Sequence, residues 1–111
     1  MVGAFVGAER ERLPIVIDGA ISAVAAYLAY MLAGTGESFF ASHCSKEPVS
    51  GLILDKLGLR PVINADMKLG EGTGALMLSP LIDMALAVYA DLPGFSDIAQ
   101  TIAYSQCPWS E

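Results

Sequence analysis

The stretch PIVIDGAISAVAAYLAYMLAGTGESFFAS, residues 14–42, decides the fold. Its first five residues, 14–18, are apolar and mostly β-branched up to Ile17, which is typical of a buried parallel strand. Gly19 then leads into an apolar segment at 20–33, which predicts a helix that ends at the following Gly-Thr-Gly. Residues 38–42 predict a second strand. Strand, helix and strand in this order indicate a parallel α/β sheet.

The chain on either side continues this alternation of elements. The expected elements are the end of a helix at 2–12, a helix at 49–57, a strand at 60–64, a helix at 73–90 and a helix at 95–104. Pro80 lies inside the long helix and predicts a kink, or a fresh start capped by Ser79. The fold class is therefore α/β, with three layers and a short parallel sheet flanked by helices. It corresponds to a Rossmann-like fragment of a larger domain, with residues 1–94 in that domain and 95–111 as a C-terminal helix and tail.

The chain is unusually apolar for its length of 111 residues, because 54% of them are hydrophobic and only 16% are charged. Such an excess indicates a membrane segment, a large interface, or a piece of a larger protein. The most apolar run, Ala20–Ala33, is shorter than the ~20 residues that cross a bilayer. The N-terminus also lacks the pattern of a signal peptide. We therefore expect a cytoplasmic protein without a membrane contact, covered by a second copy or a partner chain.

Charge and cysteine content exclude other classes. The net charge is −6 without a cluster of Lys or Arg, so we expect no nucleic-acid partner. Cys44 and Cys107 are too few for a disulfide framework. With a single histidine besides, a structural metal site is not expected.

Polar residues follow each predicted strand. Asp18 and Gly19 follow the first strand, Ser42 to Ser45 the second, and Asn64 to Glu71 the third. Ligands of open parallel sheets bind beyond the carboxyl ends of the strands, so these loops are expected to converge on one site. The alternative is that loops are polar in any protein.

Each of these side chains also has a simpler interpretation. His43 is more simply explained as a loop histidine that is hydrogen-bonded to backbone. Ser42 and Ser45 could bind phosphate or cap the next helix. Asp18 could bind a ribose hydroxyl or hold the turn at Gly19. Lys68 could pair with a phosphate or be solvated.

The segment KLGEGTGA, residues 68–75, places Glu71 between glycines. It matches neither the dinucleotide-binding fingerprint nor the Walker phosphate loop. Gly70, Gly72 and Gly74 permit close approach of a ligand and unusual backbone angles, and free amides at the start of a helix favour an anion. A carboxylate in a closed pocket can act as a general base. From spacing alone, a first-turn acid favoured by the helix dipole explains Glu71 slightly better.

Several stretches together resemble one family. They are VIDGAIS (16–22), FASHCSKEP (40–48), the LGL that ends a helix (57–59) and KLGEGTGALMLSPLIDMALAVY (68–89). Their order and spacing resemble the C-terminal part of nicotinate-nucleotide–dimethylbenzimidazole phosphoribosyltransferase, over about residues 3–104. The specific feature is the Lys/Arg-Leu-Gly-Glu-Gly motif combined with the Ser-His-x-Ser loop.

The resemblance implies an enzyme that transfers phosphoribose from nicotinate mononucleotide to dimethylbenzimidazole, giving α-ribazole phosphate and nicotinate in cobalamin synthesis. It implies that Glu71 takes a proton from one benzimidazole nitrogen while the other attacks the anomeric carbon. The residues expected to bind substrate are Ser45, Lys68, Leu69, Gly70 and Gly72. The residues expected to shape the site are Asp18, Gly19, Ser42 and His43. No metal and no other cofactor is implied.

The resemblance also has departures. Family members usually have an aromatic residue in place of Ala20, a small residue in place of Lys46 and arginine in place of Lys68. They are also longer, and their N-terminal part supplies a phosphate loop, a second site glutamate and much of the base pocket. We therefore expect the isolated chain to be inactive, and to act with a partner or as a homo-oligomer. The alternative function is a non-catalytic binding or assembly module of the same fold.

Overall fold

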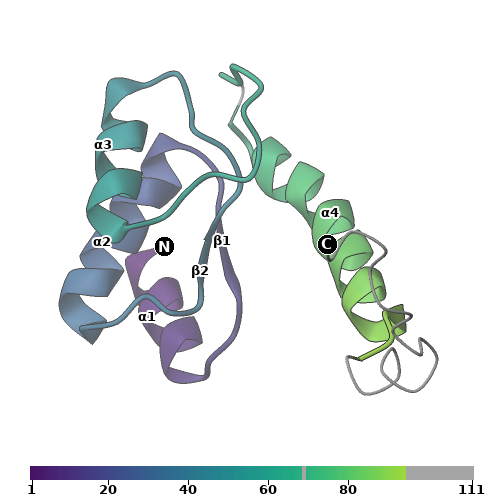
Figure 1. The fold of residues 1–111 in the computed structure, drawn as a ribbon. Coiled ribbons are helices and arrows are strands. Elements are labelled where there is room, and N and C mark those ends of the chain that lie inside the picture. The colour runs from purple at the N-terminus through teal and green to yellow at the C-terminus, as the bar shows by residue number, and fades with distance from the viewer. Residues whose placement is uncertain (69, 95–111) are drawn as a thin grey trace, which may run out of the picture. The chain divides into compact units, whose positions relative to one another are not determined.

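The computed structural model describes residues 1–68 and 70–94 (Figure 1). The elements in chain order are α1 (Val2–Arg10), β1 (Ile15–Ile17), α2 (Ala20–Ala33), β2 (Phe39–Ala41), α3 (Pro48–Leu57) and α4 (Thr73–Asp91). The chain divides into two compact units, Met1–Leu81 and Ile82–Glu111. The first unit holds the sheet, α1 to α3 and the start of α4, and the second holds the remainder of α4.

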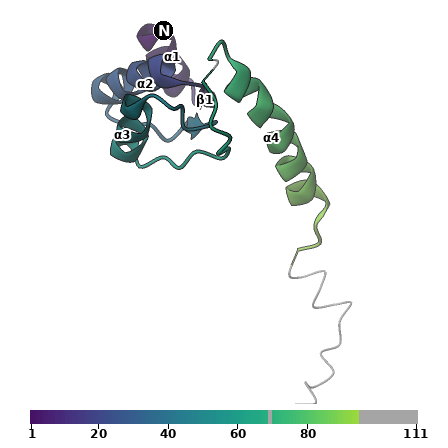
Figure 2. The same ribbon diagram turned by 90° about the horizontal axis from the view of Figure 1, so that it is seen from above.

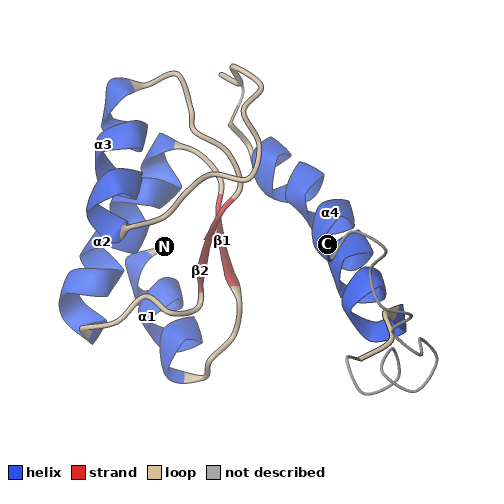
Figure 3. Cartoon of the chain, viewed as in Figure 1, coloured by secondary structure: helices blue, strands red, loops and turns tan. Residues whose placement is uncertain are grey.

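β1 and β2 pair in parallel, with Ile15 opposite Phe39 and Ile17 opposite Ala41 (Figure 3). The predicted α/β class with a short parallel sheet and flanking helices is thus confirmed. The predicted third strand at 60–64 is wrong as a full strand, because only Ile63 forms a bridge, to His43. Pro61 has no N–H to donate to a ladder, which limits how far this segment can pair.

The core lies between one face of the sheet and α1, α2 and α3, which gather on the same side of the strands in both ribbon views (Figures 1 and 2). The strand residues buried against these helices are Ile15, Ile17, Phe39 and Ala41. α2 contributes only small side chains to this core, namely Ala23, Ala26 and Ala29. These alanines allow α2 to lie close to the sheet. The opposite face of the sheet is called the open face below. On it, Val16 is half-buried and Phe40 is 45% exposed.

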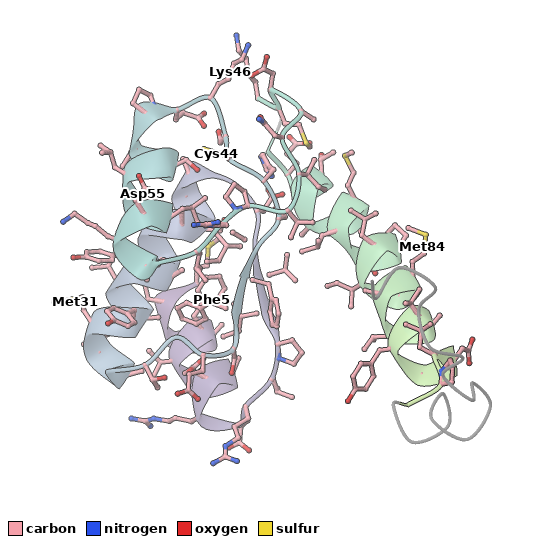
Figure 4. The ribbon with its side chains drawn as sticks, in the orientation of Figure 1. Phe5, Met31, Cys44, Lys46, Asp55 and Met84 are labelled. Carbon is pink, nitrogen blue, oxygen red and sulfur yellow. The ribbon has the colours of Figure 1, made fainter. Side chains whose placement is uncertain are left out.

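The large apolar side chains of α2 point away from this core. The exposed ones include Ile21, Val24, Leu28, Met31 and Leu32, and Figure 4 shows Met31 on the outer side of the helix. A surface helix normally presents its polar side to water. The outer face of α2 is therefore apolar surface that this chain does not cover among its described residues.

The ends of α2 and α3 follow the predicted signals. Gly34 ends α2 at φ 77° and Gly58 ends α3 at φ 68°, both left-handed conformations that glycine adopts without strain. At the start of α2, the hydroxyl of Ser22 accepts the backbone N–H groups of Asp18 and Gly19 at 3.0 and 2.9 Å. Pro48 begins α3, where its missing N–H costs nothing.

α4 runs continuously through Pro80, so the predicted fresh start at Ser79 is wrong. Its 19 residues, Thr73–Asp91, are long and apolar enough to cross a membrane by length and composition. The sequence analysis tested only Ala20–Ala33 for this property. A core helix of a soluble protein has the same length and composition, so the property alone does not distinguish the two.

Glu9 of α1 is a buried carboxylate that the sequence analysis did not identify, and it is only 7% exposed. Its two oxygens accept the backbone N–H of Glu37 at 3.1 Å and of Ser38 at 3.3 Å. The hydroxyl of Thr35 donates to it as well, at 3.3 Å. Glu9 thus fixes the loop that enters β2, at the amino end of that strand.

Candidate functional site

A cavity of about 630 Å³ opens beyond the carboxyl ends of β1 and β2, within the first unit. Its lining contains every predicted site residue that the structure describes, except Ser42. These lining residues are Asp18, Gly19, His43, Ser45, Lys68, Gly70, Glu71 and Gly72. The predicted convergence of three loops is therefore observed in the described residues. Leu69, predicted to bind substrate, lies outside them, as do the helix expected at 95–104 and Cys107.

The backbone around Glu71 adopts an unusual conformation. Gly70, Glu71 and Gly72 have consecutive positive φ angles of 71°, 58° and 79°. Glycine tolerates this left-handed region, but a residue with a Cβ is strained there by about 1–2 kcal/mol. Thr73 closes the turn, since its N–H and hydroxyl both donate to the carbonyl of Gly70, at 3.1 and 2.8 Å. The glycines therefore allow a left-handed turn that lifts Glu71 from the start of α4 into the cavity lining.

Asp18 holds this turn against the sheet. One oxygen of its carboxylate accepts the N–H of Gly72 at 3.0 Å, and the other accepts the N–H of Ala75 at 3.1 Å. Asp18 thus caps α4 from a position more than fifty residues earlier in the chain. The sequence analysis expected free amides here for a ligand anion. That expectation is wrong for these two amides, because a carboxylate of the same chain occupies them.

Gly74 permits the close packing of α4 on this carboxylate. A Cβ at position 74 would overlap Nδ1 of His43 and would lie 2.9 Å from Oδ1 of Asp18. Gly74 is buried and already helical, so its role is to leave space rather than to allow a special backbone angle. The sequence predicted that Gly74 permits close approach of a ligand or an unusual backbone angle, whereas in the structure it makes room for His43 and Asp18. The signal for it was present, because glycine is unfavourable inside a helix unless packing requires it.

Ser42 and His43 form a buried pair below the cavity, at 0% and 3% exposure. The hydroxyl of Ser42 donates to the carbonyl of Ile17 at 2.7 Å. The same oxygen lies 3.1 Å from Nδ1 of His43. The sequence analysis considered a loop histidine bonded to backbone. The structure instead gives His43 a side-chain partner.

Ser45 is buried and its hydroxyl donates to the carboxylate of Glu47. A ligand phosphate at Ser45 would have to displace Glu47, which also lines the cavity. Lys68 lines the same cavity, and among the described residues it has no ion pair. Lys46 instead pairs with Asp66 at 3.6 Å on the exposed side of these loops, and Figure 4 shows it projecting outward. Such an exposed ion pair contributes little stability.

Glu71 is exposed, which corrects the expectation of a carboxylate enclosed in a closed pocket. It does lie at the predicted edge of the sheet and in the cavity lining. It is exposed because no other described segment covers it.

The chemical capacity of the cavity follows from its lining. Phe5, Val16 and Ile21 provide apolar surface, which suits a flat aromatic ring. Lys68 provides a positive charge, while Glu47 and Glu71 provide carboxylates. Within the described residues no cluster of three or more His, Cys, Asp or Glu side chains could hold a metal ion. The arrangement therefore offers a ligand apolar surface, one cation and several carboxylates.

Comparison with known families gives one clear match. A phosphoribosyltransferase family model matches residues 1–99 of this chain. The chain is 41% identical over 98 residues to the nicotinate-nucleotide–dimethylbenzimidazole phosphoribosyltransferase of Desulforamulus reducens. It is 42% identical over 98 residues to the enzyme of that name from Acetivibrio thermocellus. Each alignment covers 87% of this chain and 28% of the relative.

A solved structure is similar in fold as well. The crystal structure of CobT from Thermus thermophilus superposes with a TM-score of 0.78 at 36% sequence identity. The superposition covers 88% of this chain and 29% of that protein. The chain thus spans less than a third of the length of the relatives that it matches.

Proposed function

Because this chain belongs to the nicotinate-nucleotide–dimethylbenzimidazole phosphoribosyltransferase family and corresponds to its C-terminal portion, we propose that it supplies the general base of that reaction. The proposed substrates are nicotinate mononucleotide and dimethylbenzimidazole, and the products are α-ribazole phosphate and nicotinate. The proposed setting is cobalamin synthesis in the cytoplasm. The observation that carries the proposal is the position of Glu71, which a strained left-handed turn holds in the lining of the cavity.

The proposed step transfers one group and one proton. A ring nitrogen of dimethylbenzimidazole attacks the anomeric carbon of the ribose, and the bond from that carbon to the nicotinate nitrogen breaks. The electron pair of that bond leaves with nicotinate. Glu71 takes the proton from the second nitrogen of the benzimidazole ring, so the product carries no extra charge on its base. A positioned general base contributes typically 10²- to 10⁴-fold to such a step.

The strain at Glu71 supports a functional role for this residue. A glycine would adopt φ 58° at position 71 without cost, as its neighbours do. A surface acid serving only the helix dipole would not require three consecutive left-handed residues. Strained backbone of this kind is concentrated at active sites, where the surrounding structure holds it in place.

The charges that line the cavity indicate that this chain supplies only part of the proposed active site. Lys68 is a cation that could contact the nucleotide phosphate, while Asp18, Glu47 and Glu71 are carboxylates in the same lining. Phosphate sites are usually built from several cations or free backbone amides. We therefore propose that another polypeptide supplies most of the phosphate site, that Lys68 adds one cation to it, and that Ser45, Leu69, Gly70 and Gly72 contact the rest of the nucleotide.

The exposed apolar side chains of this chain also indicate that another polypeptide completes the active site. Phe40 on the open face of the sheet and the outer side chains of α2 are exposed apolar groups. Patches of this kind mark surfaces that another protein covers. We propose that the polypeptide covering them, in a partner chain or a second copy, completes the active site. The isolated chain is then inactive.

The test is an assay of product formation by this chain alone and by this chain together with the polypeptide that completes it. Nicotinate mononucleotide and dimethylbenzimidazole are the substrates, and α-ribazole phosphate is identified by chromatography and mass. The proposal predicts product from the complete assembly and none from the isolated chain. An assembly that binds its partner firmly but forms no product would instead support the alternative, a non-catalytic assembly module.

A further inference from the structure

One ring nitrogen of His43, Nδ1, has a hydrogen-bond partner among the described residues, and the other, Nε2, has none. The side chain is 3% exposed, yet it lines the cavity. Its only hydrogen-bonding contact among the described residues is from Nδ1 to the hydroxyl of Ser42. No fully buried side-chain nitrogen or oxygen in the described structure lacks a partner. Nε2 is therefore not fully enclosed, and it belongs to a side chain that lines the cavity.

The hydrogen bonds of Ser42 determine which nitrogen carries the proton. A serine hydroxyl has one proton, and Ser42 directs it at the carbonyl of Ile17, 2.7 Å away. The next nearest acceptor, the carbonyl of Asp18 at 3.4 Å, is also a group that can only accept. The oxygen of Ser42 is thus left as an acceptor toward His43. When the ring carries one proton, that proton is on Nδ1.

We propose that Nε2 of His43 is a hydrogen-bond acceptor for a ligand hydroxyl at the floor of the cavity. With the ring proton fixed on Nδ1, Nε2 presents a lone pair to the bound molecule. The inference rests on the proposed function in one respect, which is the identity of the ligand. Glu71 accepts the proton of the benzimidazole, so the donors that remain are the ribose hydroxyls of the nucleotide.

The position of His43 supports an interaction with the nucleotide rather than a purely structural role. The ring packs on Gly74, where a Cβ would overlap Nδ1. His43, in the loop that follows β2, thus packs on the start of α4, and it lines the same cavity as Glu71. A buried acceptor held this firmly distinguishes ligands that have a donor from ligands that lack one, because the unpaired nitrogen would remain desolvated.

The tautomer can be measured directly, because His43 is the only histidine of the chain. The chain is labelled with ¹⁵N-histidine and its two ring nitrogens are observed by long-range proton–nitrogen correlation at a pH where the ring carries one proton. We expect the proton on Nδ1 in the wild type and a mixed or reversed tautomer in Ser42→Ala. Ser50→Ala removes another buried serine and serves as the control that leaves the tautomer unchanged. A wild-type proton on Nε2 would overturn the proposal.

Ligand binding is tested with nicotinate mononucleotide and its 2′-deoxy and 3′-deoxy forms, added to the labelled chain in its complete assembly. We expect the Nε2 resonance to move on binding, and one deoxy form to bind about 3- to 10-fold more weakly than the parent, as expected for one hydrogen bond. His43→Asn retains an N–H near Nδ1 but has no acceptor at Nε2, so it should abolish that preference. His43→Gln places an amide near Nε2 and should keep part of it.

The outcomes separate this inference from the proposed function. If the parent nucleotide binds and reacts while Nε2 does not move, and both deoxy forms bind as well as the parent, the role of His43 is wrong and the function stands. If the complete assembly neither binds nor converts the nucleotide, both are wrong. The comparison of wild-type affinities needs no variant, so the test holds even if a substitution at position 43 prevents folding.

Discussion

At the scale of single residues, the site depends on backbone conformation at Glu71 and on empty space at Gly74. Glu71 has φ 58° between two glycines of similar φ. Gly74 has no side chain where one would overlap His43. The sequence indicated that glycines surround a carboxylate. It did not indicate which glycine is needed for a positive φ angle and which is needed because a Cβ would overlap a neighbouring side chain. That distinction depends on the contact of Gly74 with His43 and Asp18, which are remote from it in sequence.

The strain at position 71 predicts a trade-off between stability and activity. Glu71→Gly should raise the free energy of unfolding by roughly 0.5–1 kcal/mol, because relief of the left-handed strain exceeds the entropy cost of a glycine. Glu71→Gln keeps a Cβ and should leave stability unchanged. Denaturant unfolding of the wild type and both variants measures this. A destabilised Glu71→Gly variant would mean that the side chain stabilises the turn.

Gly74 in α4 and Gly51 in α3 are both helical, so their substitution by alanine gives a matched comparison. Gly74→Ala should destabilise the fold by about 1–3 kcal/mol, because its Cβ forces His43 or Asp18 to move. Gly51→Ala in α3 should be neutral or stabilise by up to about 1 kcal/mol, since its Cβ would meet only Sγ of Cys44, at 3.7 Å. Thermal unfolding of both variants checks the contrast. Equal effects would contradict the role given to Gly74.

At the scale of elements, two carboxylates fix the two ends of the sheet. Glu9 binds the loop that enters β2, and Asp18 binds the turn that enters α4. The element ranges of α2 and α3 could be predicted because glycine, proline and apolar periodicity are local signals. The length of the third strand, predicted at 60–64, was overestimated. Strand pairing depends on the neighbouring strand, which a local sequence pattern does not identify. Glu9 was missed because a buried acid at a helix end has no sequence signal of its own.

The two carboxylates predict local and separate effects on hydrogen exchange. Asp18→Asn should speed exchange of the amide protons of Gly72 and Ala75, because an amide side chain can accept at only one of its two atoms. Glu9→Gln is the matched control, and it should affect Glu37 and Ser38 instead. Each substitution should cost about 1–2 kcal/mol of stability. Faster exchange at Gly72 in Glu9→Gln, without any in Asp18→Asn, would contradict the capping role.

At the scale of the whole molecule, the chain has a core on one face of its sheet and uncovered apolar surface elsewhere. α2 buries alanines and exposes larger side chains, which is the reverse of an ordinary surface helix. Composition alone predicted that more protein covers this chain. The alignments agree with this prediction, because the chain matches less than a third of the length of its relatives. Which residues lie uncovered could not be predicted, because α2 is apolar on all sides.

The open face of the sheet predicts the surface on which assembly depends. Phe40→Ser should leave the stability of the chain nearly unchanged, because the side chain is 45% exposed. It should weaken self-association or binding of the completing polypeptide. Light scattering and unfolding of the same samples separate the two effects. A wild-type chain that is monomeric and binds no other polypeptide would contradict the assignment of this face.

The claim that Glu71 is the general base is tested most directly by the turnover of Glu71→Gln in the complete assembly. Glu11→Gln, an exposed acid at the end of α1, serves as the matched control. We predict that kcat for α-ribazole phosphate formation falls by at least about 100-fold in Glu71→Gln, while the KM for nicotinate mononucleotide changes little. A Glu71→Gln enzyme that turns over within a few-fold of the wild type would contradict the account.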